Sequence, residues 1–213
     1  MKGGGAEAER LGEGARGIGV GLNEDQVEAL IDYLDRLYLW NDSAGLTRID
    51  RGDAVRLHLL DALTIVPALA GATEILDLGT GAGVPGIPLA IAVPGLRVTL
   101  VETRRRKCSF LAETIGGLGL VDCTVMEEDA HVLAASGRRW EVVTGRAFLA
   151  PRGLLELGSR LLGPAGRVVV MGGPGLDMAE LATVEPMRAV YERELVLPGG
   201  SERRTVVAFE RGR

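Results

Sequence analysis

The sequence is poor in the residues that build metal sites and disulfide frameworks. Its two cysteines, Cys108 and Cys123, lack the spacing of metal ligands, so we expect two reduced thiols. No apolar run approaches the roughly 20 residues that span a bilayer, and no signal-peptide pattern opens the chain. We therefore expect a cytoplasmic protein that neither enters a membrane nor carries a metal.

Aromatic residues and positive charge are also scarce. Only 4% of the residues are aromatic, which argues against a surface that stacks many bases of a single strand. The formal net charge is −5, so any contact with RNA must use a local basic patch. Apolar residues, in contrast, make up 46% of the 213 residues, which is enough for one sizeable domain with its own core.

The most informative stretch is a glycine-rich turn between an expected strand and an expected helix. Residues 74–78 form a short apolar run, residues 79–83 read Gly-Thr-Gly-Ala-Gly, and a helix begins near residue 84. Glycines let a ligand approach the backbone closely, and the helix start offers free N–H groups. Dinucleotide enzymes carry G-x-G-x-x-G, whereas the third glycine comes one residue early here.

A carboxylate before this turn decides between two ligands. Asp77 would repel a pyrophosphate but suits a ligand with positive or hydroxyl groups. S-adenosylmethionine has both, so we favour it over a nicotinamide cofactor. A plain strand–turn–helix would need one glycine rather than three. The cofactor contacts predicted in this stretch are Asp77, Gly79, Thr80, Gly81 and Gly83.

The ends of the next two expected strands also carry carboxylates. Glu102 follows the second strand, about 20 residues beyond the turn, where an acidic side chain can accept hydrogen bonds from both ribose hydroxyls. The third strand leads into Asp129 and Ala130, which could hold adenine through the Asp129 carboxylate and the Ala130 backbone. Asp129 could equally cap the helix that follows, and both interpretations stay open.

The alternation of strands and helices predicts an α/β fold with a parallel sheet covered on both faces. The last two strands predict an antiparallel hairpin, the usual end of a Rossmann-like class I methyltransferase with a seven-stranded sheet. The expected strands are 74–78, 97–101, 122–126, 140–144, 166–171, 190–197 and 204–209, and the helices between the first five lie near 84–92, 105–116, 130–135 and 151–162.

Three segments divide the chain. Residues 1–17 are rich in Gly, Ala and Glu and predict a disordered tail. Residues 18–70 predict a helical subdomain, with one helix from about Leu22 to Trp40 capped by Asn23 and a second over 53–69. Residues 71–213 form the expected methyltransferase domain. On the second helix, His58 and Asp61 lie three residues apart on one face, and we favour a structural pair over a catalytic one.

Basic residues mark the expected acceptor side. The run at 104–107 opens a helix beside the cleft, where it could hold RNA phosphates or form a solvated helix start. Arg146 follows the fourth strand, next to the position of the transferred methyl group. It is the predicted catalytic residue, on the acceptor side or at the carboxylate of the cofactor, with a structural ion pair as the alternative. The predicted substrate contacts are Arg104, Arg105, Arg106, Lys107 and Arg146.

Taken together, these segments resemble the glucose-inhibited division protein B family, bacterial methyltransferases that act on N7 of one guanine in small-subunit rRNA. The resemblance covers about residues 22–209 and is most specific at 77–90, which include Pro-Gly-Ile-Pro. The other matching pieces are Trp40-Asn41, Leu46-Thr47, His58 with Asp61, Glu102-Thr103, Arg106-Lys107, Phe110-Leu111 and Gly145-Arg146-Ala147-Phe148.

The resemblance implies a monomeric S-adenosylmethionine-dependent methyltransferase of 16S rRNA, with Thr103 among its cofactor contacts and the small ribosomal subunit or its RNA as partner. Guanine N7 carries a lone pair and no proton, so such an enzyme needs orientation rather than a general base. Departures from the family pattern keep two alternatives open: a methyltransferase of a small molecule or protein, and a protein that binds the cofactor without transfer. These departures are Gly45, Leu57, Ala62, Gly145 and Gly172.

Overall fold

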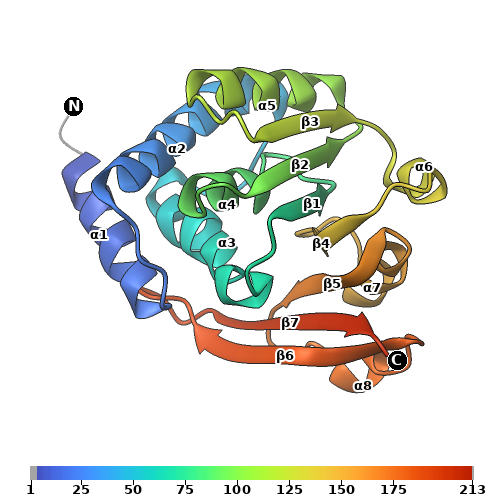
Figure 1. The fold of residues 1–213 in the computed structure, drawn as a ribbon. Coiled ribbons are helices and arrows are strands. Elements are labelled where there is room, and N and C mark those ends of the chain that lie inside the picture. Colours follow the sequence, from blue (N-terminus) through green and yellow to red (C-terminus); the bar gives the residue numbers. More distant parts are fainter. Residues whose placement is uncertain (1–3, 213) are drawn as a thin grey trace.

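The computed structural model describes residues 4–212, which form one sheet between two layers of helices (Figure 1). The strands are β1 Glu74–Leu78, β2 Arg97–Glu102, β3 Cys123–Glu127, β4 Trp140–Thr144, β5 Leu162–Gly172, β6 Met187–Val196 and β7 Arg203–Arg211. Their spatial order is β3-β2-β1-β4-β5-β7-β6. The pairs from β3 to β5 are parallel, whereas β7 is antiparallel to both of its neighbours.

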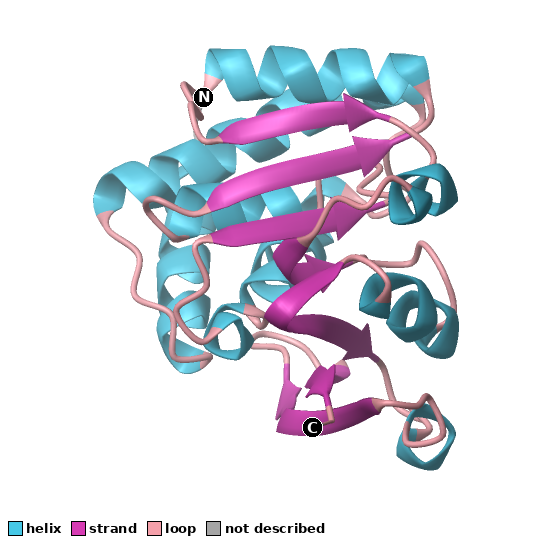
Figure 2. Cartoon of the chain, turned by 45° about the vertical axis from the view of Figure 1, so that its right-hand side comes forward, coloured by secondary structure: helices cyan, strands magenta, loops and turns pink. Residues whose placement is uncertain are grey.

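Helices lie on both sides of this sheet (Figure 2), and two hydrophobic clusters fill the space between them and its faces. One cluster joins the N-terminal helices, α4 and α5 to one face, and the other joins α6, α7 and α8 to the opposite face. The helices are α1 Gly4–Gly17, α2 Glu24–Ala44, α3 Asp61–Leu63, α4 Gly86–Ala92, α5 Arg105–Gly117, α6 Ala130–Ala135, α7 Pro151–Ser159 and α8 Met178–Leu181.

The sheet confirms the fold class predicted from the alternating pattern. The bounds of β1 and β4 agree with the prediction, and β5 begins four residues before the expected strand. The predicted hairpin is present, with β7 inserted between β5 and β6. Apolar side chains alternate between the two clusters along β5, where Val168 and Val170 pack on one face and Val169 on the other.

The N-terminal tail is where the sequence prediction is wrong. Residues 4–17 form helix α1 rather than a disordered segment, and residues 1–3 lie outside the described residues. Leu11 and Ala15, one helical turn apart, are fully buried in the core, and Ile18 continues the same stripe. Composition alone missed this helix because few apolar residues suffice when their spacing brings them to one face.

Helix α2 begins where the sequence predicts. Asn23 accepts a hydrogen bond from the backbone N–H of Gln26, whose side chain accepts in return from Asn23, which forms a capping box. The helix runs past the predicted end to Ala44 and stops at Gly45, whose φ of 59° is left-handed. No helix within residues 4–212 has the length and apolarity needed to cross a membrane. The domain boundaries at 18–70 and 71–213 stay a prediction.

The prediction of one regular helix over residues 53–69 is wrong. The chain instead forms a 3₁₀ turn at Arg51–Asp53, a π-helical turn at Val55–Leu60, the short α3, and a second 3₁₀ turn at Val66–Leu69. Wide turns of this kind are rare in regular helices and often occur at functional sites. This one carries His58, and Asp61 follows it directly.

Candidate functional site

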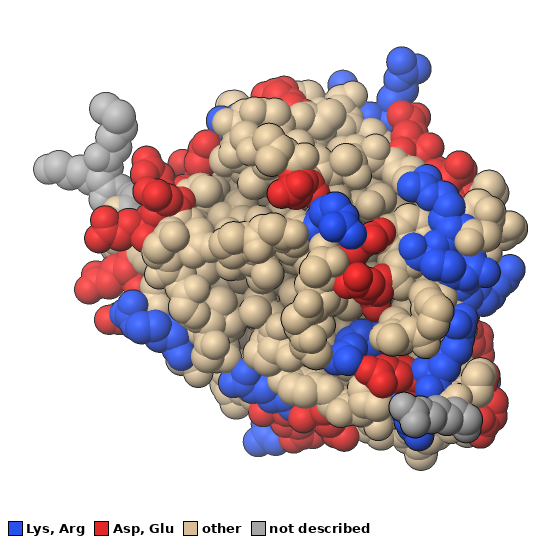
Figure 3. Space-filling model, viewed as in Figure 1, with Lys and Arg blue, Asp and Glu red and all other residues tan. Residues whose placement is uncertain are grey.

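A cleft of about 560 Å³ opens at the edge of the sheet where the parallel strands end. Parallel α/β sheets bind their ligands at this edge. Figure 3 shows Lys and Arg gathered toward the side to which the strands point in Figure 1, while Asp and Glu dominate beside α1. The cleft is lined by residues 46–49, 79–82, 146–147 and 171–173 together with His58, Asp61, Val84, Lys107 and Arg204.

The glycine turn lines one wall of the cleft, which the sequence predicts to bind the cofactor and which we call the cofactor wall. Gly81 adopts a left-handed φ of 59°, and a Cβ added there would find only Lys107 Nζ at 3.6 Å and Gly79 O at 3.8 Å. This position therefore faces open space, as a ligand-binding glycine must. Gly83 has a different reason to be glycine, because a Cβ there would press on the Ile87 and Leu111 side chains.

Helix α2 supports this turn through a residue that the sequence analysis did not single out. Tyr33 is fully buried, and its hydroxyl donates a 2.8 Å hydrogen bond to the carbonyl oxygen of Ala82. Burial raises the pKa of Tyr33, so the hydroxyl keeps its proton. The N-terminal helices thus help to fix the cofactor wall.

Asp77 stabilises the turn from behind rather than lining the cleft. It is completely buried, and its Oδ2 accepts hydrogen bonds from Thr80 Oγ1 at 2.6 Å and Gly86 N at 2.9 Å. Its Oδ1 has no hydrogen-bond partner in the described structure. Burial raises the pKa of Asp77 to about 7, although these two hydrogen bonds oppose the shift. Asp77 therefore connects the turn to the start of α4.

Glu102 also orders the turn. Its Oε2 accepts from Gly81 N at 3.1 Å, and its Oε1 accepts from the backbone N–H groups of Thr103 and Arg104, both at 2.9 Å. A carboxylate offers about four lone pairs, so one on Oε2 remains free for a ligand. The predicted pair of ribose hydrogen bonds therefore requires a change in one of these three contacts.

The end of β3 shows the helix-capping contact that the sequence left as one alternative. Asp129 Oδ1 accepts hydrogen bonds from His131 N at 2.8 Å and Val132 N at 3.2 Å, as an N-cap does. Ala130 is buried, whereas Thr103 is exposed. None of these residues lines the cleft itself. Their predicted contacts with the cofactor stay a prediction.

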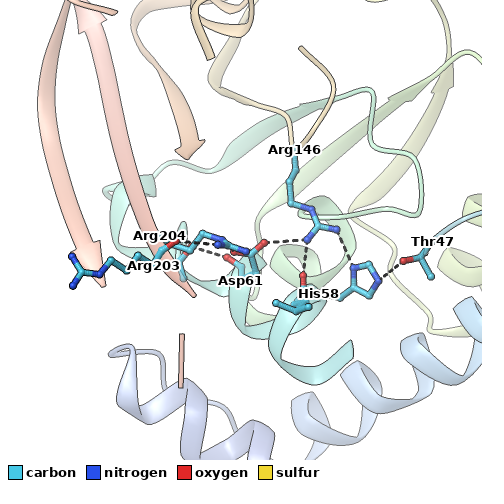
Figure 4. Close-up of polar contacts among 8 residues, drawn as sticks. Thr47, His58, Asp61, Arg146, Arg203 and Arg204 are labelled. Carbon is cyan, nitrogen blue, oxygen red and sulfur yellow. Dashed lines mark hydrogen bonds and ion pairs between the residues drawn. The ribbon is translucent and has the colours of Figure 1, made fainter. Parts of the chain in front are cut away.

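Arg146 lies at the centre of the opposite wall, which the sequence predicts to face the acceptor and which we call the acceptor wall (Figure 4). Its Nη1 donates to Leu57 O at 2.7 Å and to Asp61 Oδ2 at 3.1 Å, and its Nη2 donates to His58 Nδ1 at 3.0 Å. The next residue, Ala147, has a left-handed φ of 54°, which is uncommon for a residue with a side chain. Two of the five guanidinium N–H groups remain without a partner in these contacts.

Asp61 joins two arginines that are distant in the sequence. Its Oδ1 accepts a 2.6 Å hydrogen bond from Arg204 Nε on β7, while its Oδ2 binds Arg146. The Asp61 side chain is 5% exposed, and the two arginine side chains are 21% and 22% exposed. The predicted pair of His58 with Asp61 is therefore replaced by contacts of each with Arg146.

His58 is neutral and has one defined tautomer. Arginine only donates, so His58 Nδ1 must be the acceptor and the proton lies on Nε2. Nε2 donates to Thr47 Oγ1 at 2.9 Å. Burial, and secondarily the charge of Arg146, lowers the pKa of His58 to about 3. The imidazole has no lone pair left to act as a general base, which supports the structural role predicted for it.

The basic run at 104–107 divides between two environments. Lys107 lines the cleft, whereas Arg104, Arg105 and Arg106 are exposed outside it. Arg48, which the sequence interpretation did not single out, lines the cleft as well. Neither Lys107 nor Arg48 forms an ion pair within residues 4–212.

Several departures from the family pattern occur where the backbone makes the contact. Gly45 occupies a left-handed helix end, a conformation that glycine adopts without strain. Leu57 contributes its carbonyl oxygen to Arg146. Gly145 leaves no room for a side chain, because an added Cβ would lie 2.7 Å from Leu78 O. No metal site accompanies them, since residues 4–212 contain no cluster of three His, Cys, Asp or Glu side chains that could hold an ion.

Strand order, the glycine turn and the acid at the end of β2 define a Rossmann-like methyltransferase that uses S-adenosylmethionine. The fold is shared with the N-terminal domain of EvdMO1 crystallised with SAH bound, which is 17% identical with a TM-score of 0.56 over 85% of this chain and 96% of that one. A putative O-methyltransferase from Klebsiella pneumoniae is 18% identical with a TM-score of 0.58 over 84% and 90%.

The chain belongs to the GidB family, rRNA small subunit methyltransferase G, whose family model matches residues 26–201. The ribosomal RNA small subunit methyltransferase G of Stenotrophomonas maltophilia strain K279a is 40% identical over 191 residues, 88% of each chain. That of Herminiimonas arsenicoxydans is 36% identical over 95% of this chain and 94% of the relative. The family resemblance seen in the sequence is thus confirmed.

The residues of the cofactor wall fit S-adenosylmethionine. Gly81 leaves space for a ligand at the backbone, and Glu102 keeps one acceptor lone pair beside that space. The cofactor would supply an electrophilic methyl group on a sulfonium. The chain itself supplies the position of the turn, through Asp77, Tyr33 and Glu102.

Proposed function

We propose that this enzyme methylates N7 of a guanine in 16S rRNA of the small ribosomal subunit, in the cytoplasm. The observation that carries the proposal is the absence of an available base in the cleft lining within residues 4–212. The Nδ1 lone pair of His58 accepts a hydrogen bond from Arg146, and each carboxylate oxygen of Asp61 accepts one from an arginine. Guanine N7 has an exposed lone pair and no proton, so it needs no base.

Positive groups around the cleft support an RNA acceptor. Lys107, Arg48 and Arg204 line the same cleft as the glycine turn. They can bind the phosphates that position a folded RNA. Arg146 is the proposed acceptor-side residue, because two of its N–H groups remain without a partner in the contacts described and it lines the cleft opposite the glycine turn. The names of the relatives support the same acceptor.

A hydroxyl acceptor fits this site less well. Methyl transfer to oxygen requires removal of the hydroxyl proton, for which the cleft offers no free imidazole or carboxylate. A small molecule with a tertiary or aromatic nitrogen, or a protein, would still be compatible with the cofactor wall. These acceptors are therefore the outcomes that the test must separate from RNA.

The test is labelled methyl transfer from S-adenosylmethionine to small ribosomal subunits, naked rRNA and a metabolite extract, compared side by side. We expect label in rRNA, at a guanine whose N7 position is identified by cleavage after reduction and aniline treatment. Label only in the extract would reject the RNA acceptor. Cofactor binding by calorimetry without transfer to any of the three would reject the enzymatic activity.

A further inference from the structure

The loop at 46–49 presents a hydroxyl group to the cleft from a fixed backbone. Asn41 Oδ1 accepts from the backbone N–H groups of Leu46 at 2.9 Å and Thr47 at 2.8 Å, and Asn41 Nδ2 donates to Thr47 O at 3.1 Å. Tyr38 donates a further hydrogen bond to Ile49 O. Four contacts from the end of α2 thus hold the loop, and Thr47 lines the cleft.

The hydrogen bonds around Thr47 have a forced direction. Arg146 can only donate, so His58 Nδ1 accepts and His58 Nε2 donates to Thr47 Oγ1. The backbone N–H of Ile49 donates to the same oxygen at 3.0 Å. Both lone pairs of the hydroxyl are therefore occupied. Its proton has no acceptor in the described structure.

We infer that Thr47 determines the specificity for guanine by donating its hydroxyl proton to O6 of the target base. This inference rests on the proposed function. The edge of guanine that carries N7 also carries O6, and both are acceptors, whereas adenine places an amino donor where guanine has O6. A hydroxyl with both lone pairs occupied can bind guanine O6 but cannot accept from the adenine amino group.

Arg146 has the role of a positioning residue in this arrangement. It fixes the tautomer of His58, and His58 in turn fixes the polarity of the Thr47 hydroxyl. Burial holds the pKa of His58 far below its usual range, so protonation does not reverse this direction near neutral pH. A reversed direction would require His58 Nδ1 to carry the proton, which would face the donor groups of Arg146.

The experiment compares wild type, Thr47→Val and Thr47→Ser on two acceptors under single-turnover conditions. The first acceptor contains the guanine that the wild type methylates, and the second carries 2-aminopurine, which lacks O6, at the same position in small subunits assembled from ligated rRNA. We expect Thr47→Val to lower the rate on guanine about tenfold and Thr47→Ser to restore most of it. The rate on 2-aminopurine should be low for wild type and unchanged by Thr47→Val.

Three results would overturn the role of Thr47: equal wild-type rates on the two bases, a Thr47→Val rate on guanine within about twofold of wild type, or an equal loss on both bases. The last result would mean that Thr47 only supports the fold, and a matching fall in S-adenosylmethionine affinity would mean the same. Failure of the wild type to methylate any rRNA guanine would instead reject the proposed function itself.

Discussion

The two walls of the cleft are held together in different ways. Most contacts of the cofactor wall join residues close in the chain: Asp77 binds groups three and nine residues away, and Glu102 binds Gly81 from 21 residues away. The exception is Tyr33, which binds Ala82 from 49 residues away. The acceptor wall uses Asp61 to join Arg146 and Arg204, which lie 85 and 143 residues away. Backbone N–H groups dominate the first wall, and charged side chains dominate the second.

This difference predicts how each wall responds to substitutions. The cofactor wall depends on glycine conformations and on acids that accept from the backbone, so a local change damages it locally. The acceptor wall depends on one buried carboxylate, so a change there releases segments from three regions of the chain. Variants that separate cofactor affinity from acceptor activity test the comparison directly.

The largest effect is expected at Asp61. Asp61→Ala leaves the Arg146 and Arg204 guanidinium groups, both mostly buried, without their counter-charge, which should lower the free energy of unfolding by about 3 kcal/mol. Urea denaturation measures this change. The matched control is Asp53→Ala, because Asp53 is 52% exposed and its partner Arg56 keeps an ion pair with Glu202, so its loss should cost less than about 1 kcal/mol. Equal effects of the two variants would contradict the central role of Asp61.

Asp77 supports the cofactor wall and His58 lies in the acceptor wall, and their contributions to the free energy of unfolding should change with pH in opposite directions. Asp77 has its pKa raised from 3.8 to about 7, so between these values the folded state holds a proton that the unfolded state lacks, and stability falls as pH rises. His58 has its pKa lowered from 6.5 to about 3, so between these values the unfolded state holds the extra proton, and stability rises with pH. The two contributions oppose each other from about pH 4 to 6.5.

Removal of either group should reveal the pH dependence of stability that the remaining group contributes. Relative to wild type, Asp77→Asn should add a slope of about +1.4 kcal/mol per pH unit to the unfolding free energy, and His58→Gln a slope of similar size and negative sign. Urea denaturation at pH 4.5, 5.5 and 6.5 gives these slopes. Parallel curves for both variants and wild type would show that neither group titrates differently on folding.

Glu102 should matter for the cofactor and little for the acceptor. Glu102→Ala removes the anchor of Gly81 N and the free lone pair, so S-adenosylmethionine affinity should fall by about 2 kcal/mol, or roughly thirtyfold. Calorimetry measures the affinity, and a filter assay measures RNA binding by the same variant. The comparison between walls fails if RNA binding falls as strongly as cofactor binding.

The smallest effect per residue is expected at the basic run. The triple variant Arg104→Ala, Arg105→Ala and Lys107→Ala should flatten the salt dependence of RNA binding by roughly 0.7–0.9 log units per phosphate contact removed, with cofactor affinity nearly unchanged. The control removes the same charge elsewhere, at the exposed residues Arg10, Arg160 and Arg188. If both triple variants change the salt slope equally, the run acts only through net charge.

Much of the fold and of the cofactor wall was predictable because the signals are contiguous. Strand β1 and the glycine turn occupy one uninterrupted stretch, and Glu102 follows at a spacing that one helix and one strand impose. The N-cap at Asn23 was predictable for the same reason. Helix α1 was not predictable in this way, because its few apolar residues become buried only when they pack against the π-helical turn.

The sequence by itself determined the order of the strands along the chain, the glycine turn and the family, because these depend on residue types at short, regular spacing. Only the tertiary structure decided that Arg146 binds Leu57 O and His58, that Asp61 joins two arginines, and that the Thr47 hydroxyl is left with its proton free. The physical reason is that hydrogen-bond direction depends on which donors and acceptors meet. Residues 47, 58, 146 and 204 meet only when the sheet brings its strand ends to one edge.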